Sequence, residues 1–188
     1  MGAPMELVDA LDQTFDHAYK VIAGVQPAQY GDPTPCEEWN VQQLLTHVVG
    51  VVTMMGEATA SGQAQRPADS MALADDPAAQ FRAAADAALA GWRKPGIMDE
   101  TINAGPGPMP GRALAGINLL DTATHSWDLA RATGQSSELP PAVAEAALEA
   151  GHQIVKAPIR EGRFGPEIEP HPGCGPTDRL VAYLGRQP

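Results

Sequence analysis

The chain is poor in the residues on which several classes of protein depend. It has only 2 cysteines in 188 residues, too few for a disulfide framework or a tetrahedral sulfur site, so we expect Cys36 and Cys174 to be free thiols. Aromatic residues make up 5% of the chain, and 12 Lys and Arg stand against 23 Asp and Glu, for a net charge of −11. Such a chain repels phosphate and offers few rings for base stacking, so neither nucleic acid nor a membrane surface is an expected partner.

Long apolar runs are also missing. The longest, residues 47–55, is far shorter than the roughly 20 residues that span a bilayer, and the N-terminus does not read as a secretory leader. We therefore expect a soluble, cytoplasmic protein. The length suits a single domain over residues 1–188, with a core at about 5–157 and a tail with a short helix at 158–188.

Alanine-rich segments separated by Pro and Gly favour an all-α fold. Apolar residues that recur every three or four positions predict a helix over residues 6–23 and another that Asn40 and Gln43 open with a capping box. Further helices are predicted from Pro77 to just before Pro95, and over residues 111–134, 141–156 and 177–184. Residues 60–76, 104–111 and 157–176 are expected to be loops, and 97–103 could be a short extended piece.

The helix predicted at 111–134 is apolar on nearly all sides, which is typical of a helix inside a bundle, and it ends at Gly134. Its polar residues Asn118, Asp121, His125 and Asp128 follow steps of three, four and three, so they share one stripe. Asp121 and His125 are four residues apart and could reach one metal ion. An Asp–His hydrogen bond inside a packed core is the alternative.

A metal site would need a third ligand from another helix. His47 lies at the edge of the apolar face of the helix that Asn40 opens, and it is the best candidate, although a lone histidine there could equally be a core residue. His152, in the helix predicted at 141–156, is the rival.

Four segments resemble a known family: LLTHVVG (44–50), THSWDLARATGQ (124–135), FGPEI (164–168) and LGRQP (184–188). They are similar to the DinB-like superfamily, and more closely to its actinobacterial branch related to mycothiol-dependent maleylpyruvate isomerase. The resemblance implies a four-helix bundle with an open divalent metal site, here with an extra C-terminal helix and a Pro/Gly-rich tail. Its ligands would be His47, Asp121 and His125. Asp121 stands where the family has Glu, and the chain is shorter than the full isomerase, whose C-terminal domain we expect to be largely missing.

The resemblance further implies a thiol-dependent isomerase or S-transferase that acts on a small electrophile, with mycothiol as a possible cosubstrate. Zinc is the first choice of metal, with nickel or another divalent ion as alternatives, since two imidazoles and a carboxylate leave a coordination position open. The other hypotheses are a metal-dependent hydrolase or cyclase that uses no thiol, and a non-catalytic metal-binding or small-molecule-binding protein. The chain could be a monomer or a homodimer.

The remaining polar residues near this site have two possible roles. Asn118 and Asp128 are expected to orient the ligands or the substrate. Alternatively, Asp128 could pair with Arg131, three residues further along its own helix. For Arg186 we expect an ion pair that holds the tail in place, rather than contact with an anionic substrate.

Overall fold

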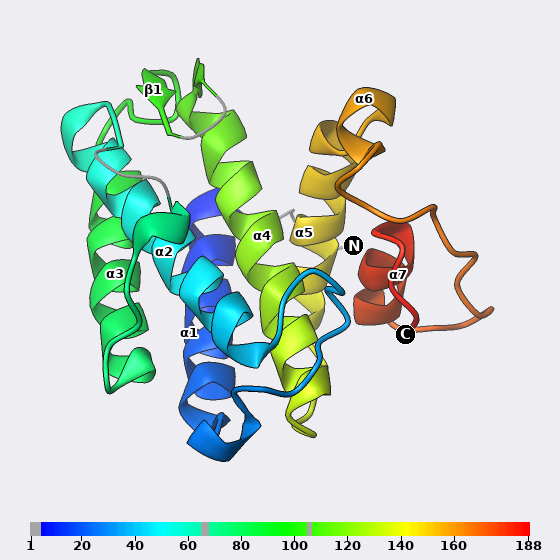
Figure 1. Ribbon diagram of the computed structural model, residues 1–188. Helices are drawn as coiled ribbons and strands as arrows, with labels where there is room; N and C mark the ends of the chain where they lie inside the picture. The colour runs from blue at the N-terminus through cyan, green and yellow to red at the C-terminus, as the bar shows by residue number, and fades with distance from the viewer. Residues whose placement is uncertain (1–4, 65–67, 105–106) are drawn as a thin grey trace.

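The computed structural model describes residues 5–64, 68–104 and 107–188, and its fold is all-α apart from one small hairpin, as the sequence predicts. Figure 1 shows long helices lying roughly side by side, with the C-terminal segment at one edge of the molecule. The main helices are α1 (Leu7–Gly24), α2 (Val41–Ser61), α3 (Pro77–Trp92), α4 (Gly111–Ala132), α5 (Pro141–Ile154) and α7 (Pro176–Tyr183). Short helices are η1 (Pro27–Gln29), η2 (Ala68–Ser70) and α6 (Ala157–Arg160).

Four of these helices form the bundle. The pairs α1–α3, α3–α2, α2–α4 and α4–α1 are in contact, so the four helices close a ring around one core. Helix α5 packs against α4 and α1 outside that ring, and α7 packs against α5 (Figure 1). The apolar side chains that the ring buries include Leu11, Phe15, Leu44, Leu45, Val48, Phe81, Leu119 and Leu129.

Helix α4 lies at the centre of this arrangement because it touches α1, α2 and α5. It therefore buries side chains on nearly every side, among them Leu114, Leu119, Leu120, Trp127 and Leu129. This explains why its sequence is apolar all round rather than along one stripe. A polar residue on such a helix lies close to other side chains and needs a partner there.

Local signals set the helix ends where the sequence predicts them. Asn40 and Gln43 form the capping box, with Gln43 N–H donating to Asn40 Oδ1 at 2.9 Å and Asn40 N–H donating to Gln43 Oε1 at 3.0 Å. This box fixes the first turn of α2, and His47 lies about two turns after Asn40. Gly134, just past α4, adopts a φ of +72°, the left-handed conformation that glycine favours at this position.

The loops depart from the prediction in three places, the first of which is the three-residue helix η2 (Ala68–Ser70) within the predicted 60–76 loop. Strands β1 (Thr101–Asn103) and β2 (Pro108–Pro110) pair antiparallel, so residues 104–111 are not simply a loop, although 105–106 lie outside the described residues. Within the predicted 157–176 loop, residues 157–160 form the single turn α6. All three elements are too short to show a period in the sequence. No helix among the described residues is long and apolar enough to cross a membrane.

Candidate metal centre

The contact between α2 and α4 brings His47, Asp121 and His125 together. His47 Nε2 lies 3.2 Å from Asp121 Oδ1, and His125 Nε2 lies 3.7 Å from the same oxygen. One nitrogen or oxygen from each residue lies within 4.8 Å of the other two, close enough for a single ion between them. The three side chains are 16%, 21% and 12% exposed, so the site is largely buried but reaches the surface.

Asp121 has the feature that most favours a cation at this site. Burial acts to raise the pKa of this carboxyl, but the attraction of His125 and the hydrogen bond with His47 outweigh it and hold the pKa below its usual value. Asp121 is therefore a carboxylate at neutral pH. Its Oδ2 atom is buried, yet no hydrogen-bond donor among the described residues reaches it. Such an orphaned acceptor costs about 1–3 kcal/mol, more when it is charged, and a cation would satisfy it.

A second carboxylate fixes the orientation of His125. Asp128 is fully buried, and its Oδ2 lies 3.0 Å from His125 Nδ1. Arg186 is the third member of this series of hydrogen bonds, because its Nε and Nη2 donate to Asp128 Oδ1 and Oδ2 at 2.8 Å each. Burial acts to raise the pKa of Asp128, but the hydrogen bonds from His125 and Arg186 lower it below the usual value. A carboxylate that holds the far nitrogen of a histidine is the usual support of a metal ligand.

This arrangement tests one prediction for Arg186 and one for Asp128. The ion pair between Arg186 and the body of the protein is confirmed. The alternative pairing of Asp128 with Arg131 is wrong, because the Arg131 guanidinium lies over the Trp127 ring, 5.4 Å from its centroid. Arg131 is exposed at the last turn of α4, whereas the Asp128 carboxylate points inward.

Two other predicted residues lie away from this cluster. Asn118 is fully buried, accepts a hydrogen bond from Trp92 Nε1 at 3.2 Å and lies 3.4 Å from Thr122 Oγ1. The bond from Trp92 joins α3 to α4, the contact with Thr122 lies within α4, and neither reaches His47, Asp121 or His125. His152, the rival third ligand, packs on the Tyr183 ring at 4.5 Å between centroids, where α5 meets α7. His152 is not in either group of converging metal-ligating side chains that the described residues contain.

Sequence reasoning missed Trp39 as part of the site. Its ring stacks on His47 with 4.3 Å between centroids and meets the edge of His125 at 5.7 Å. It therefore covers both imidazoles and limits their contact with water. A surface pocket of about 190 Å³ lies beside them, lined by Trp39, Gln43, Thr46 and His47. The only signal in the sequence was the position of Trp39 directly before the capping box.

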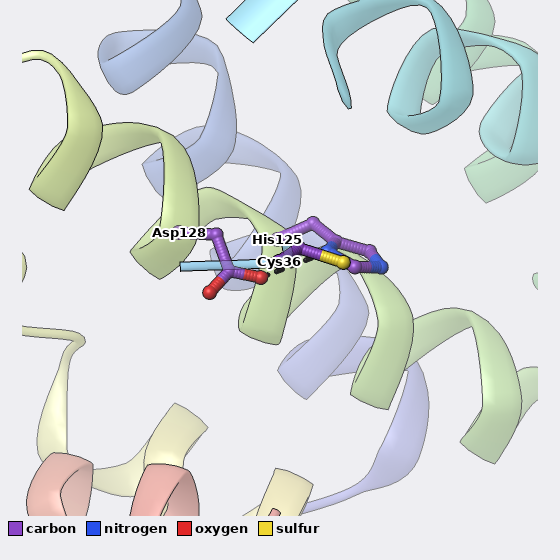
Figure 2. A group of neighbouring side chains, drawn as sticks. All are labelled: Cys36, His125 and Asp128. Carbon is purple, nitrogen blue, oxygen red and sulfur yellow. Dashed lines mark hydrogen bonds and ion pairs between the residues drawn. The ribbon is translucent and has the colours of Figure 1, made fainter. Parts of the chain in front are cut away.

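Cys36 also lies next to the site, from the same loop as Trp39. The buried Thr34 hydroxyl organises this loop, since its oxygen accepts from Cys36 N–H at 3.2 Å and lies 2.8 Å from the Trp39 carbonyl oxygen. The Cys36 sulfur lies within 4.8 Å of ligand atoms of His125 and Asp128, and Figure 2 shows the three side chains grouped together. Burial and the charge of Asp128 raise the pKa of this thiol, so it is protonated at neutral pH.

Comparisons with known proteins agree with this fold and show the family of the chain. The family model described as the mycothiol maleylpyruvate isomerase N-terminal domain matches residues 11–130, a segment that contains α2 and most of α4. Uncharacterized protein Rv0738 of Mycobacterium tuberculosis is 38% identical over 168 residues, which are 88% of this chain and 90% of that protein. Uncharacterized protein MT0763, from another strain of the species, matches equally well.

Solved structures extend the likeness to three dimensions. The crystal structure of the mycothiol-dependent maleylpyruvate isomerase superposes with a TM-score of 0.54 over 76% of this chain and 68% of that one, at 14% identity. A mutant of that enzyme, in which a histidine is replaced by alanine, gives the same TM-score at 12% identity. Because the identity is so low, these structures establish the shared all-α, DinB-like fold and nothing more. With the matched residues 11–130 covering well over half of its length, the chain belongs to the family of the mycothiol maleylpyruvate isomerase N-terminal domain.

Proposed function

We propose that this protein binds a divalent metal ion through His47, Asp121 and His125 and acts with a low-molecular-weight thiol on a small electrophilic substrate. The thiol is mycothiol or a close relative, and the reaction is an isomerisation or the transfer of the thiol to the substrate. The proposal rests above all on the buried Asp121 Oδ2 atom, an acceptor without a donor among the described residues, at the point where two imidazoles converge.

The donor set suits a catalytic rather than a structural ion. Two imidazoles and one carboxylate leave a position free, and zinc is the first choice for such a set, although nickel would also suit it. Asp121 is one methylene shorter than Glu, but the atoms of the three ligands still come within 4.8 Å of one another. When bound, such an ion lowers the pKa of a thiol or of water and polarises a carbonyl group.

The residues of the chain provide the surroundings that this chemistry needs. Asp128 holds His125 Nδ1, so that Nε2 points toward the ion position, and Arg186 holds Asp128. Trp39 shields one side of both imidazoles, and the pocket beside His47 gives a small substrate access. The mycothiol-dependent isomerase with the same fold supports a thiol as the second reactant.

Metal analysis of the purified protein tests the ion directly. Wild type should hold about one divalent ion per chain, and His125→Ala should lose it. His152→Ala is the matched control, because it removes the same side chain from the junction of α5 and α7 and should keep the ion. If His125→Ala retained the metal, or if the wild type reloaded with zinc or nickel bound neither, the proposed centre would be wrong.

Turnover assays with a maleyl acid and with chlorodinitrobenzene test the chemistry. The expected result is conversion that needs both the metal and an added thiol, and that His125→Ala abolishes. Conversion that continued without thiol would replace the proposal with a metal-dependent hydrolase or cyclase. Metal binding with no conversion of any electrophile would instead indicate a binding protein.

A further inference from the structure

Cys36, His125 and Asp128 form a second group of metal-ligating side chains, beside the first. Cys36 comes from the loop before α2, and the other two come from α4 (Figure 2). One ligand atom from each lies within 4.8 Å of the other two, the same closeness that unites His47, Asp121 and His125. The loop is held in place by the buried Thr34, so the sulfur is positioned by the fold.

We propose that Cys36, His125 and Asp128 are a second cation site, which shares His125 with the first and takes a thiophilic divalent ion. Nothing in this inference depends on the reaction proposed above. It requires only the placement of the three side chains, and it would stand even if the protein were not an enzyme.

His125 allows only one of the two sites to be filled at a time. Its Nε2 atom faces Asp121 at 3.7 Å and serves the first site, whereas its Nδ1 atom faces Asp128 at 3.0 Å and serves the second. A neutral imidazole has one nitrogen with a free lone pair, and the other carries a proton. An ion at Nδ1 therefore leaves the proton on Nε2, directed toward Asp121, and the ligand set of the first site is broken.

Asp128 retains the capacity to bind an ion despite its partners. A carboxylate offers about four lone-pair positions, and Arg186 and His125 use three of them. The positive charge of Arg186 opposes a cation here, but the charge of the Cys36 thiolate offsets it. Binding then releases the proton of the thiol, as it does for other cysteine ligands.

The two sites have different donor atoms and should therefore prefer different ions. The first has only nitrogen and oxygen atoms, and the second adds sulfur, which soft ions prefer. A soft ion such as Cd²⁺ is therefore expected at Cys36, and harder ions are expected at His47 and Asp121. Exposure to a soft ion would accordingly draw His125 away from the first site.

Titration of the reduced, metal-free protein with Cd²⁺ tests the proposal, because sulfur bound to cadmium gives a charge-transfer absorption in the ultraviolet. The wild type should show this band and bind no more than one Cd²⁺ per chain. Cys36→Ser should lose the band. Cys174→Ser is the matched control, since Cys174 is the other half-buried free thiol and should leave the band unchanged.

His47→Ala distinguishes the second site from an extension of the first. It removes a ligand of the first site only, so the band should persist, whereas His125→Ala should abolish it. Absence of the band in the wild type, its loss in His47→Ala, or two Cd²⁺ ions per chain would each overturn the proposal. Circular dichroism and melting curves of each variant show whether a lost band reflects a lost ligand or an unfolded protein. Loss of the band in Cys36→Ser supports the proposal only if that variant is folded.

Discussion

Replacement of Arg186 by Met removes the ion pair that ties the C-terminal segment to the candidate site. Arg186 is 11% exposed and donates two hydrogen bonds of 2.8 Å to Asp128, which is fully buried. Methionine has a similar length and no charge, so it keeps most of the packing of the side chain. The substitution thus leaves the Asp128 carboxylate in the interior with only His125 as a hydrogen-bond partner.

We expect Arg186→Met to cause a large loss of stability for a single substitution. Removal of one partner from a buried ion pair costs about 3–5 kcal/mol, and the lower end applies because His125 remains. For a chain of this size, about 3 kcal/mol corresponds to a fall in Tm of roughly 6–12 °C. Metal affinity should also fall by about 10–100-fold, since Asp128 no longer holds His125 in one orientation. Urea denaturation of the metal-free protein and a metal titration measure the two effects separately.

Arg179→Met is the matched control, with the same change in α7. Arg179 lies 3.9 Å from Glu145 in a largely exposed pair, whose loss should cost less than about 1 kcal/mol. The double variant Arg186→Met with Asp128→Asn removes the unpaired charge and should regain part of the stability. Equal stability of Arg186→Met and Arg179→Met, or unchanged metal affinity in Arg186→Met, would refute the role assigned to this pair.

Two further predictions concern the rest of the bundle. Trp92→Phe removes the donor to Asn118 Oδ1 and should cost about 1–3 kcal/mol in urea denaturation, without a change in metal content; a variant as stable as wild type would contradict the assigned hydrogen bond. Burial and the charge of Lys20 lower the pKa of His17, so the unfolded chain binds a proton near pH 6.5 that the folded chain resists. The stability present above pH 6.5 is therefore lost as the pH falls, and His17→Gln should lose less between pH 7.5 and 5 than wild type does. An equal loss in both proteins would show that His17 is not responsible.

The helices could be predicted because their signals are local. The repeat of apolar residues, the Asn40–Gln43 capping box and the glycine past α4 act over a few residues, and each has its expected effect in the structure. The hairpin β1–β2 escaped prediction because three-residue strands are too short to show a period. Part of the candidate site could be predicted for the same reason. Positions four apart on a helix share a face, so the sequence alone placed Asp121 beside His125.

What the sequence determined by itself was therefore an all-α chain, with one helix that carries a carboxylate and an imidazole on the same stripe. Only the tertiary structure decided which distant residues join them. The third candidate ligand is His47 rather than His152, because the packing of α2 on α4 places His47 beside Asp121, whereas His152 packs against α7. The tertiary structure also made Arg186, rather than Arg131, the partner of Asp128, and it brought Cys36 and Trp39 in from a loop without a period. Those contacts depend on how the helices pack and on where the loops and the C-terminal segment cross them. The spacing of residues along the sequence carries no information on either.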